Sequence, residues 1–215
     1  LAGGRCGLLT HSVPSMPRGK KPPRPTDVDG IIRWEAEHGR MHASFFDWGD
    51  KEGKERGVAE ELLELLDPED TGAFEGLTVR SPGQDPPDVV VRKANGERVG
   101  IEITELVDRG TIEAVQAGRL HVGWSEWSAV KIREEVATLI RRKDKPDAVK
   151  GGPYEQNWLL IHTDEPDCSR HRLEEAMTGV TFLTDLFDCA YLLTSYDPQI
   201  QRCPLVEIPL HRRSS

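Results

Sequence analysis

The segment from Pro86 to Asp108, PPDVVVRKANGERVGIEITELVD, places the tightest constraint on the fold of this chain. Two runs rich in Val and Ile flank the dipeptide at 95–96, Asn-Gly, which is the strongest short-range signal for a β-hairpin. Asp88 and Glu102 interrupt these apolar runs. Because a charged group costs free energy in a buried strand unless it is paired, the two carboxylates point to a functional site.

The length of the hairpin loop decides whether the two carboxylates meet. A two-residue loop would pair Asp88 with Ile103 and turn Glu102 to the opposite face of the sheet. A three-residue loop, with Gly96 in the left-handed conformation, would pair Asp88 with Glu102 at a Cβ separation of about 4.5–5.5 Å. Glycine at the third loop position favours this second register. In it, Asp88, Glu102 and Thr104 project from one face.

The paired carboxylates of the second register predict a metal site. Two carboxylates this close repel each other unless a cation, a shared proton or basic groups relieve the repulsion. Oxygen ligands on a rigid hairpin suit Mg²⁺ or Mn²⁺. We therefore expect a divalent ion to be held by Asp88 and Glu102.

The remaining apolar patterns predict a sheet with helices around it. Helices are expected over residues 26–49, 51–67, 111–120, 127–143, 169–179 and 180–187. Strands are expected over residues 73–81, 87–93, 98–106, 157–163 and 189–197, with a last edge strand over 204–210 that Pro209 breaks. This order predicts an α/β (α+β) fold with a central mixed sheet flanked by helices.

Length and composition suggest one globular domain behind a tail. The density of Pro, Gly and Lys predicts a flexible tail over residues 1–26, and the length allows a single domain over 27–215. Four dispersed cysteines without a CxxC pair argue against a disulfide framework or a zinc finger, and favour a reducing, cytoplasmic environment. No apolar run approaches the ~20 residues of a membrane span, so we expect no membrane association.

A basic run at the end of the 127–143 helix has two interpretations. The run consists of Arg141, Arg142, Lys143 and Lys145. It could bind nucleic-acid phosphates. Alternatively, it could stabilise the helix through the helix dipole, because the last turn of a helix favours cations. The net charge of −9 argues against general coating of nucleic acid but leaves room for a local basic groove.

The hairpin carries a recognisable motif. Pro-Asp at 87–88, followed after thirteen residues by Glu-Ile-Thr at 102–104, resembles the motif of the PD-(D/E)XK nucleases, which have the restriction-endonuclease-like fold. In that family a helix precedes a strand meander that carries Asp and then Glu-x-Lys, and a helix and another strand follow. The elements expected over residues 55–165 have the same order.

This resemblance implies a metal-dependent nuclease that hydrolyses phosphodiester bonds of nucleic acid, in the first instance DNA. The implied ligands of Mg²⁺ or Mn²⁺ are Asp88, Glu102 and the carbonyl of Ile103. An acidic residue of the preceding helix, Glu60 or Glu61, would add an outer ligand. The implied partner is nucleic acid, and a homodimer is a possible assembly.

One departure from the family pattern matters. Thr104 stands where the family usually has lysine, and threonine supplies no positive charge, although some nucleases of this fold use threonine there. Lys131, on the following helix, is expected to deliver an ammonium group from another position. The alternatives are a catalytically inactive nuclease-like binding or assembly module, and an unrelated α/β protein whose hairpin carboxylates only solvate a sheet face.

Overall fold

The computed structural model of the chain describes residues 51–81, 83–108, 126–165, 167–197 and 200–213. All of these residues belong to one compact unit that spans residues 38–215. The predicted tail over residues 1–26 and the helices expected over 26–49 and 111–120 lie outside the described residues.

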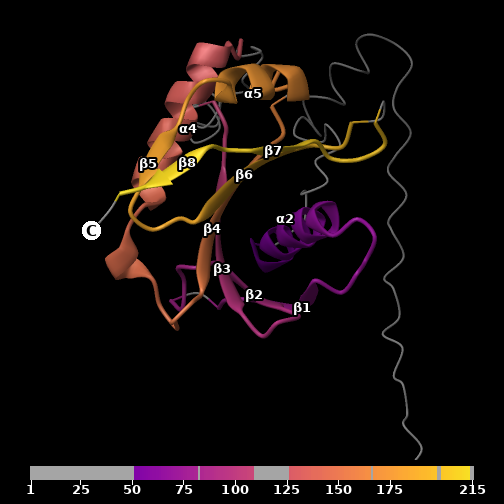
Figure 1. Cartoon of the computed structure of the whole chain (residues 1–215). Helices are drawn as coiled ribbons and strands as arrows, with labels where there is room; N and C mark the ends of the chain where they lie inside the picture. The colour runs from indigo at the N-terminus through magenta and orange to yellow at the C-terminus, as the bar shows by residue number, and fades with distance from the viewer. Residues whose placement is uncertain (1–50, 82, 109–125, 166, 198–199, 214–215) are drawn as a thin grey trace, which may run out of the picture. The chain divides into compact units, whose positions relative to one another are not determined.

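A mixed sheet of six strands forms the centre of this unit (Figure 1). The strands are β1 (Phe74–Val79), β2 (Val89–Lys93), β3 (Arg98–Glu105), β4 (Gln156–Thr163), β6 (Cys189–Thr194) and β7 (Leu205–Glu207). They lie in the order β1-β2-β3-β4-β6-β7. The pairs β3–β4 and β4–β6 are parallel and the other pairs are antiparallel, so the predicted mixed sheet is confirmed.

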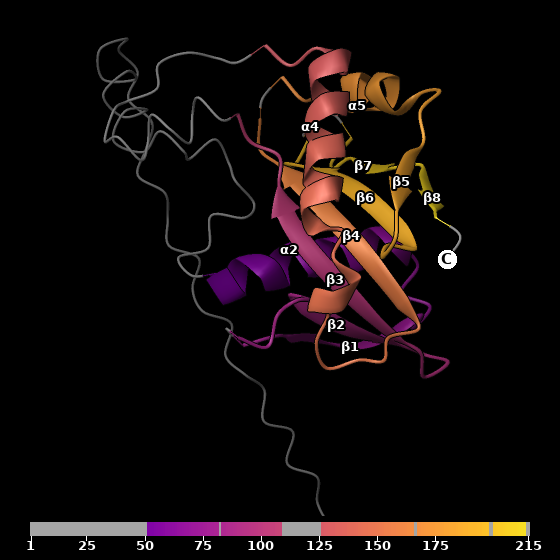
Figure 2. The ribbon, with the colours of Figure 1, turned by 90° about the vertical axis from the view of Figure 1, so that its left-hand side faces the viewer.

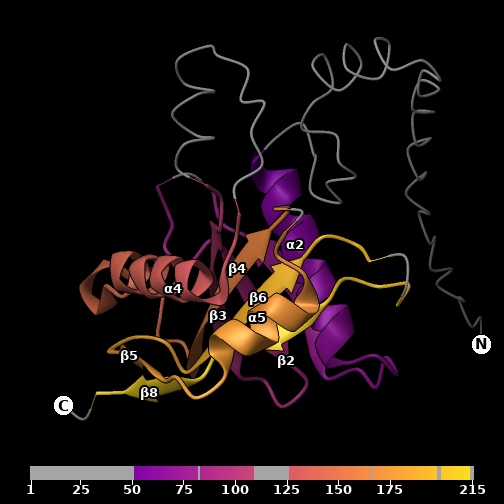
Figure 3. The same ribbon diagram turned by 90° about the horizontal axis from the view of Figure 1, so that it is seen from above.

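Helices cover both faces of the sheet, as predicted. Helix α2 (Lys51–Leu66) lies on one face, and helices α4 (Ala129–Lys143) and α5 (Arg170–Met177) lie on the other (Figure 1; Figure 3). Each face has its own apolar cluster, because side chains alternate along each strand. In β3, Ile101 and Ile103 pack toward α2, which leaves Glu102 and Thr104 to the face of α4.

The register of the β2–β3 hairpin is the one that a three-residue loop predicts. Val89 pairs with Ile101, and Val91 pairs with Val99. Lys93 and Glu97 close the loop through a 2.8 Å hydrogen bond from the Lys93 N–H to the Glu97 carbonyl. Gly96, with φ of +86°, adopts the left-handed conformation that glycine accepts without a steric penalty. Continuing this ladder by one residue places Asp88 opposite Glu102.

Helix α4 lies across β3 and β4 and turns a stripe of buried side chains to the sheet (Figure 2). The stripe consists of Ile132, Val136, Leu139 and Ile140. Ser128 caps the start of the helix, where its hydroxyl accepts a hydrogen bond from the Lys131 N–H. Val130, an apolar residue in the first turn of the same helix, is 60% exposed. It precedes Ile132 by two positions, which is about 200° around the helix.

The helix expected over residues 180–187 is wrong. Strand β5 (Phe182–Thr184) occurs there and pairs in parallel with strand β8 (Leu210–Arg212). The β-branched and aromatic side chains of this segment suit a strand, in which Phe182 and Thr184 are buried and Leu183 between them is exposed. The last predicted edge strand is confirmed as β7, and Pro209 separates it from β8.

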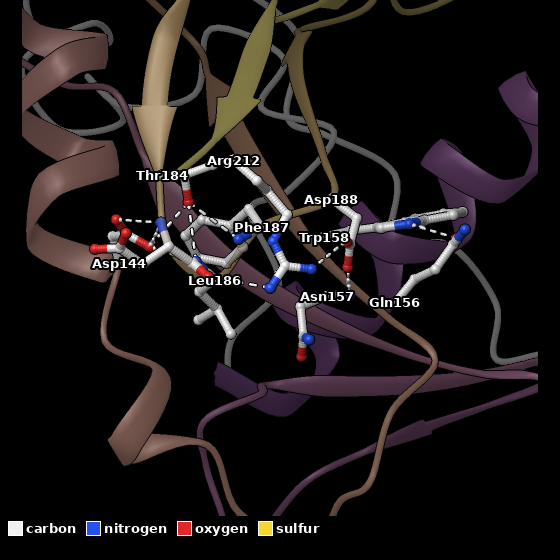
Figure 4. A network of polar contacts seen from close by, with 10 residues as sticks. Asp144, Gln156, Asn157, Trp158, Thr184, Leu186, Phe187, Asp188 and Arg212 are labelled. Atoms are coloured by element: carbon white, nitrogen blue, oxygen red, sulfur yellow. Dashed lines mark hydrogen bonds and ion pairs between the residues drawn. The ribbon is translucent and has the colours of Figure 1, made fainter. Parts of the chain in front are cut away.

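Asp144, directly after α4, holds the turn that follows β5 (Figure 4). Its carboxylate accepts hydrogen bonds from the Thr184 hydroxyl at 2.8 Å and from the main-chain N–H groups of Asp185 and Leu186 at 2.8–3.0 Å. The Thr184 hydroxyl accepts a further bond from the Phe187 N–H at 3.0 Å. The Asp144 carboxylate thus accepts hydrogen bonds from main-chain N–H groups that would donate to main-chain carbonyls if this segment were a helix. A 3-10 turn, η1 (Pro146–Ala148), leads from here toward β4.

None of the described helices is both long and apolar enough to cross a membrane.

Replacing Asp144 with alanine should destabilise the fold. The change removes the acceptor of the buried Thr184 hydroxyl and of the Asp185 N–H, and we expect a loss of about 2–3 kcal/mol in the free energy of unfolding. Urea unfolding followed by circular dichroism measures it. The matched control is Asp147→Ala, because Asp147 is exposed. Equal unfolding midpoints for the two variants would contradict the role of Asp144.

Candidate functional site

The hairpin brings Asp88 and Glu102 together as buried groups. Their exposed fractions are 6% and 8%. Asp88 Oδ2 accepts a hydrogen bond of 2.8 Å from the Ile103 N–H. Strand β2 begins at Val89, so the ladder between β2 and β3 ends before Ile103. The Asp88 carboxylate accepts the hydrogen bond that a main-chain carbonyl of β2 would otherwise accept from Ile103. The N–H and C=O of one strand residue point to the same side, so the Ile103 carbonyl is also directed toward the side of Asp88.

Close packing beside β3 holds Asp88 in place. Gly100 lies two residues before Glu102 in β3, on the same face. A Cβ atom on Gly100 would be 3.0 Å from Pro87 Cγ and 3.4 Å from a ring carbon of Tyr154. The absence of a side chain at Gly100 therefore lets Pro87 pack directly onto the strand, next to Asp88.

Helix α2 adds a third buried carboxylate and a cation to the site. Glu55 is 8% exposed. Lys51, one turn earlier, places its Nζ 3.1 Å from Glu55 Oε1, 3.5 Å from Asp85 Oδ2 and 3.7 Å from Asp88 Oδ1. A single ammonium group, on a side chain that is 67% exposed, therefore bridges three carboxylates.

Helix α4 meets the other side of the site through its last turn. Lys143 Nζ donates a hydrogen bond of 2.6 Å to Glu102 Oε1. Arg142 donates one of 3.0 Å to the Thr104 hydroxyl. The second oxygen of Glu102, Oε2, is buried and has no hydrogen-bond partner among the described residues. Half of the Glu102 carboxylate is thus available to a further ligand.

The site carries more negative charge than its own cations compensate. Burial raises the pKa of Glu55, and the neighbouring Asp88 adds to the rise, while Lys51 opposes it. Burial also raises the pKa of Glu102, again with a contribution from Asp88, although the ion pair with Lys143 lowers it. A cation or a proton added here would relieve this excess.

The donors that remain fit a hard divalent ion. In the part of the chain that the structure describes, no three His, Cys, Asp or Glu side chains already converge in a metal-holding cluster. Lys143 occupies one oxygen of Glu102, and the Ile103 N–H occupies one oxygen of Asp88. Glu102 Oε2 and the Ile103 carbonyl are left for a cation, and Asp88 Oδ1, which lies 3.7 Å from Lys51 Nζ, can join them; such a set with water suits Mg²⁺ or Mn²⁺.

Lys131 is not part of this site, contrary to the expectation from sequence. Its Nζ donates a 2.8 Å hydrogen bond to Asp108 and lies 4.4 Å from the ring centre of Trp127. It stands in the first turn of α4, about 18 Å along the helix axis from Lys143. The ammonium that reaches Glu102 comes from Lys143, at the opposite end of the same helix.

The acidic residue that α2 contributes was also predicted at the wrong position. Glu60 is exposed, and Glu61 lies beside the thiol of Cys203, where its charge contributes, after burial, to raising the pKa of that thiol to about 12. Glu55 occupies the site instead. The signal was present in the sequence, because Glu55 precedes the buried residues Val58, Ala59 and Leu62 by three, four and seven positions, on one helix face.

The basic run at the end of α4 divides into two groups. Arg142 and Lys143 turn to the sheet and contact the site. Arg141 donates to the Thr138 hydroxyl on its own helix, and Lys145 is exposed. Nucleic-acid contacts of these residues stay a prediction.

Replacing Glu55 with glutamine should stabilise the protein at alkaline pH. A carboxyl group whose pKa is raised in the folded protein binds protons more tightly in the native state than in the unfolded state. The stability of the native state therefore falls as pH rises from the ordinary pKa of glutamate, about 4.5, through the raised pKa of Glu55. Glu55→Gln removes this penalty. Thermal unfolding at pH 8 should give a higher midpoint for the variant, and the difference should vanish near pH 4.

The control is Glu64→Gln, an exposed position on the same helix, which should unfold like the wild type at both pH values. A Glu55→Gln protein that is less stable than the wild type at pH 8 would mean that Glu55 is a structural ion-pair partner of Lys51.

Comparison of this chain with protein-family models, with curated proteins and with solved structures finds no match. Its function is therefore inferred from the carboxylate site.

Proposed function

We propose that this chain is a metal-dependent nuclease of the PD-(D/E)XK type, which hydrolyses phosphodiester bonds of nucleic acid, in the first instance DNA. The observation that carries the proposal is the placement of Asp88 opposite Glu102 beside the main chain of Ile103. The three-residue loop predicts this pairing, and the resemblance implies Asp88, Glu102 and the Ile103 carbonyl as the metal ligands.

The order and pairing of the elements support the same proposal. Helix α2 is followed by the antiparallel strands β1, β2 and β3, then by helix α4 and by strand β4, which is parallel to β3. The resemblance predicts this succession of helix, strand meander, helix and strand. The buried Glu55 on α2 fits the acidic residue that the preceding helix often adds in this fold.

In the proposed reaction, Asp88, Glu102 and the Ile103 carbonyl would hold Mg²⁺ or Mn²⁺. Such an ion, when bound, activates water as a nucleophile and stabilises charge on the phosphoryl oxygens. Glu55, whose pKa is raised by burial and by Asp88, accepts a hydrogen bond from the attacking water and orients it. Asp88, held by the Ile103 N–H and by the packing of Pro87, keeps its carboxylate oriented toward the ion.

Basic side chains around the carboxylates would meet the phosphate backbone. Arg142 and Lys143 end α4 beside the site, and Lys145 follows them on the surface. Lys51 is the exposed cation on the side of α2. Because the chain has a net charge of −9, we expect binding to nucleic acid to be local to these basic side chains and to weaken steeply with salt.

A second function is favoured by one observation. Thr104 replaces the usual lysine, and Lys143 already pairs with Glu102. A nuclease-like module without catalytic activity, which binds nucleic acid or assembles with a partner, would have the same fold and the same ion pair. Cleavage, and not metal binding, separates the two functions.

The first test is calorimetric titration with Mn²⁺ at pH 8. We expect the wild type to bind and the double variant Asp88→Asn/Glu102→Gln to lose affinity by about 100-fold or more, because both charged ligands are removed. The matched control is Glu105→Gln, since Glu105 lies on the same strand and pairs with Lys54 of α2 at 3.2 Å. Equal affinity of the wild type and the double variant would refute the site.

Incubation of a supercoiled plasmid with Mg²⁺ or Mn²⁺ then tests catalysis. Nicking or linearisation by the wild type, lost in the double variant, is the result expected of a nuclease. Metal binding without cleavage of either DNA or RNA would favour the inactive module.

A further inference from the structure

We propose that Lys143 is a positioning residue of the site: from the end of α4 it holds one oxygen of Glu102, presents the other to the divalent ion, and supplies the positive charge that Thr104 does not. The inference rests on the proposed nuclease function and concerns a residue outside the hairpin motif.

The position of Lys143 on its helix is unusual for a lysine. It follows Val136, Leu139 and Ile140 by seven, four and three positions, so it continues the stripe that α4 turns to the sheet. Its side chain is 27% exposed, whereas the side chain of Glu102 opposite is 11% exposed. A lysine that served only the helix dipole would point to solvent, as the neighbouring Arg141 does.

The contact with Glu102 is asymmetric. Lys143 Nζ lies 2.6 Å from Oε1, and Oε2 is buried without a hydrogen-bond partner among the described residues. A buried carboxylate oxygen without a partner is costly, and a carboxylate that serves only an ion pair would normally have both oxygens satisfied. Oε2 instead receives no hydrogen bond from the ammonium group, so it can bind a cation.

The neighbouring residue reinforces this assignment. Arg142 donates to the Thr104 hydroxyl at 3.0 Å, so the last turn of α4 brings a cation to each of the two β3 positions at which the family motif carries Glu and Lys. Lys131, the other candidate on this helix, is engaged by Asp108 at 2.8 Å. The positive charge at position 104 therefore comes from helix α4 and not from strand β3.

Two opposite effects on metal affinity follow. An ammonium group beside a divalent ion repels it, so replacing Lys143 with methionine should tighten Mn²⁺ binding at pH 8 by about tenfold. An arginine at the same position has a planar fork that matches both carboxylate oxygens, so Lys143→Arg should occupy Oε2 and weaken Mn²⁺ binding by about tenfold. A residue with a merely structural role would not produce shifts of opposite sign.

The rate of cleavage gives a second readout. Plasmid cleavage by Lys143→Met should fall by about 100-fold at pH 8 despite its tighter metal binding, because the positive charge beside the reacting phosphate is gone.

The experiment titrates Mn²⁺ into the full-length wild type, Lys143→Met, Lys143→Arg and the control Lys93→Met, and measures plasmid cleavage by each. Lys93 is a matched control because its Nζ pairs with Glu97 at 3.3 Å at the turn of the hairpin. The control should bind and cleave like the wild type. If the methionine variant is too unstable to titrate, weaker Mn²⁺ binding by Lys143→Arg carries the test.

Failure of this inference differs from failure of the proposed function. A wild type that binds and cleaves, with both Lys143 variants equal to it in affinity and rate, overturns the role of Lys143 alone. Mn²⁺ affinity shifted in the same direction in both variants also overturns it. A wild type that binds no Mn²⁺ overturns the metal site and the role of Lys143 together.

Discussion

The site depends on one main-chain constraint, the register of the β2–β3 hairpin. A loop of three residues that ends at Gly96, with φ of +86°, sets Val89 opposite Ile101 and therefore Asp88 opposite Glu102. A shift by one residue would send Glu102 to the apolar face that α2 covers. The hydrogen bond from the Ile103 N–H to Asp88 strengthens this arrangement at the point where β2 ends.

The three layers of the fold each contribute to the charge balance around the hairpin. Helix α2 contributes Glu55 and Lys51 from one face of the sheet, and α4 contributes Lys143 from the other. Burial and the neighbouring Asp88 nevertheless raise the pKa values of Glu55 and Glu102, so the charged forms of both groups reduce stability at neutral pH. A bound cation would remove this penalty.

The fold could be predicted largely from local patterns. The Asn-Gly turn and the apolar alternation predicted the hairpin, and periodicity predicted α2, α4 and the buried strand β4. The segment over 180–187 was predicted as a helix and is not one. Its structure depends on the distant carboxylate of Asp144, which binds the turn after β5. Sequence alone does not reveal such a contact, since its partners lie about forty positions apart.

The site could be predicted only in part, for a related reason. Asp88 and Glu102 were found because they interrupt apolar strands, and their pairing followed from Gly96. Glu55 was missed, and Lys143 was assigned to nucleic acid and not to Glu102, although each continues the buried stripe of its helix. A charged residue in register with an apolar stripe is the signal that would have found both, and it required no family motif.

The central claim is that these carboxylates hold a divalent ion, and crystallography with Mn²⁺ tests it most directly. Crystals of the protein soaked in MnCl₂ should give an anomalous difference peak within about 2.5 Å of Asp88 and Glu102, with Lys143 still on the other oxygen of Glu102. A map without a peak there, at a Mn²⁺ concentration that fills other sites on the protein, would contradict the assignment of a metal site to this hairpin.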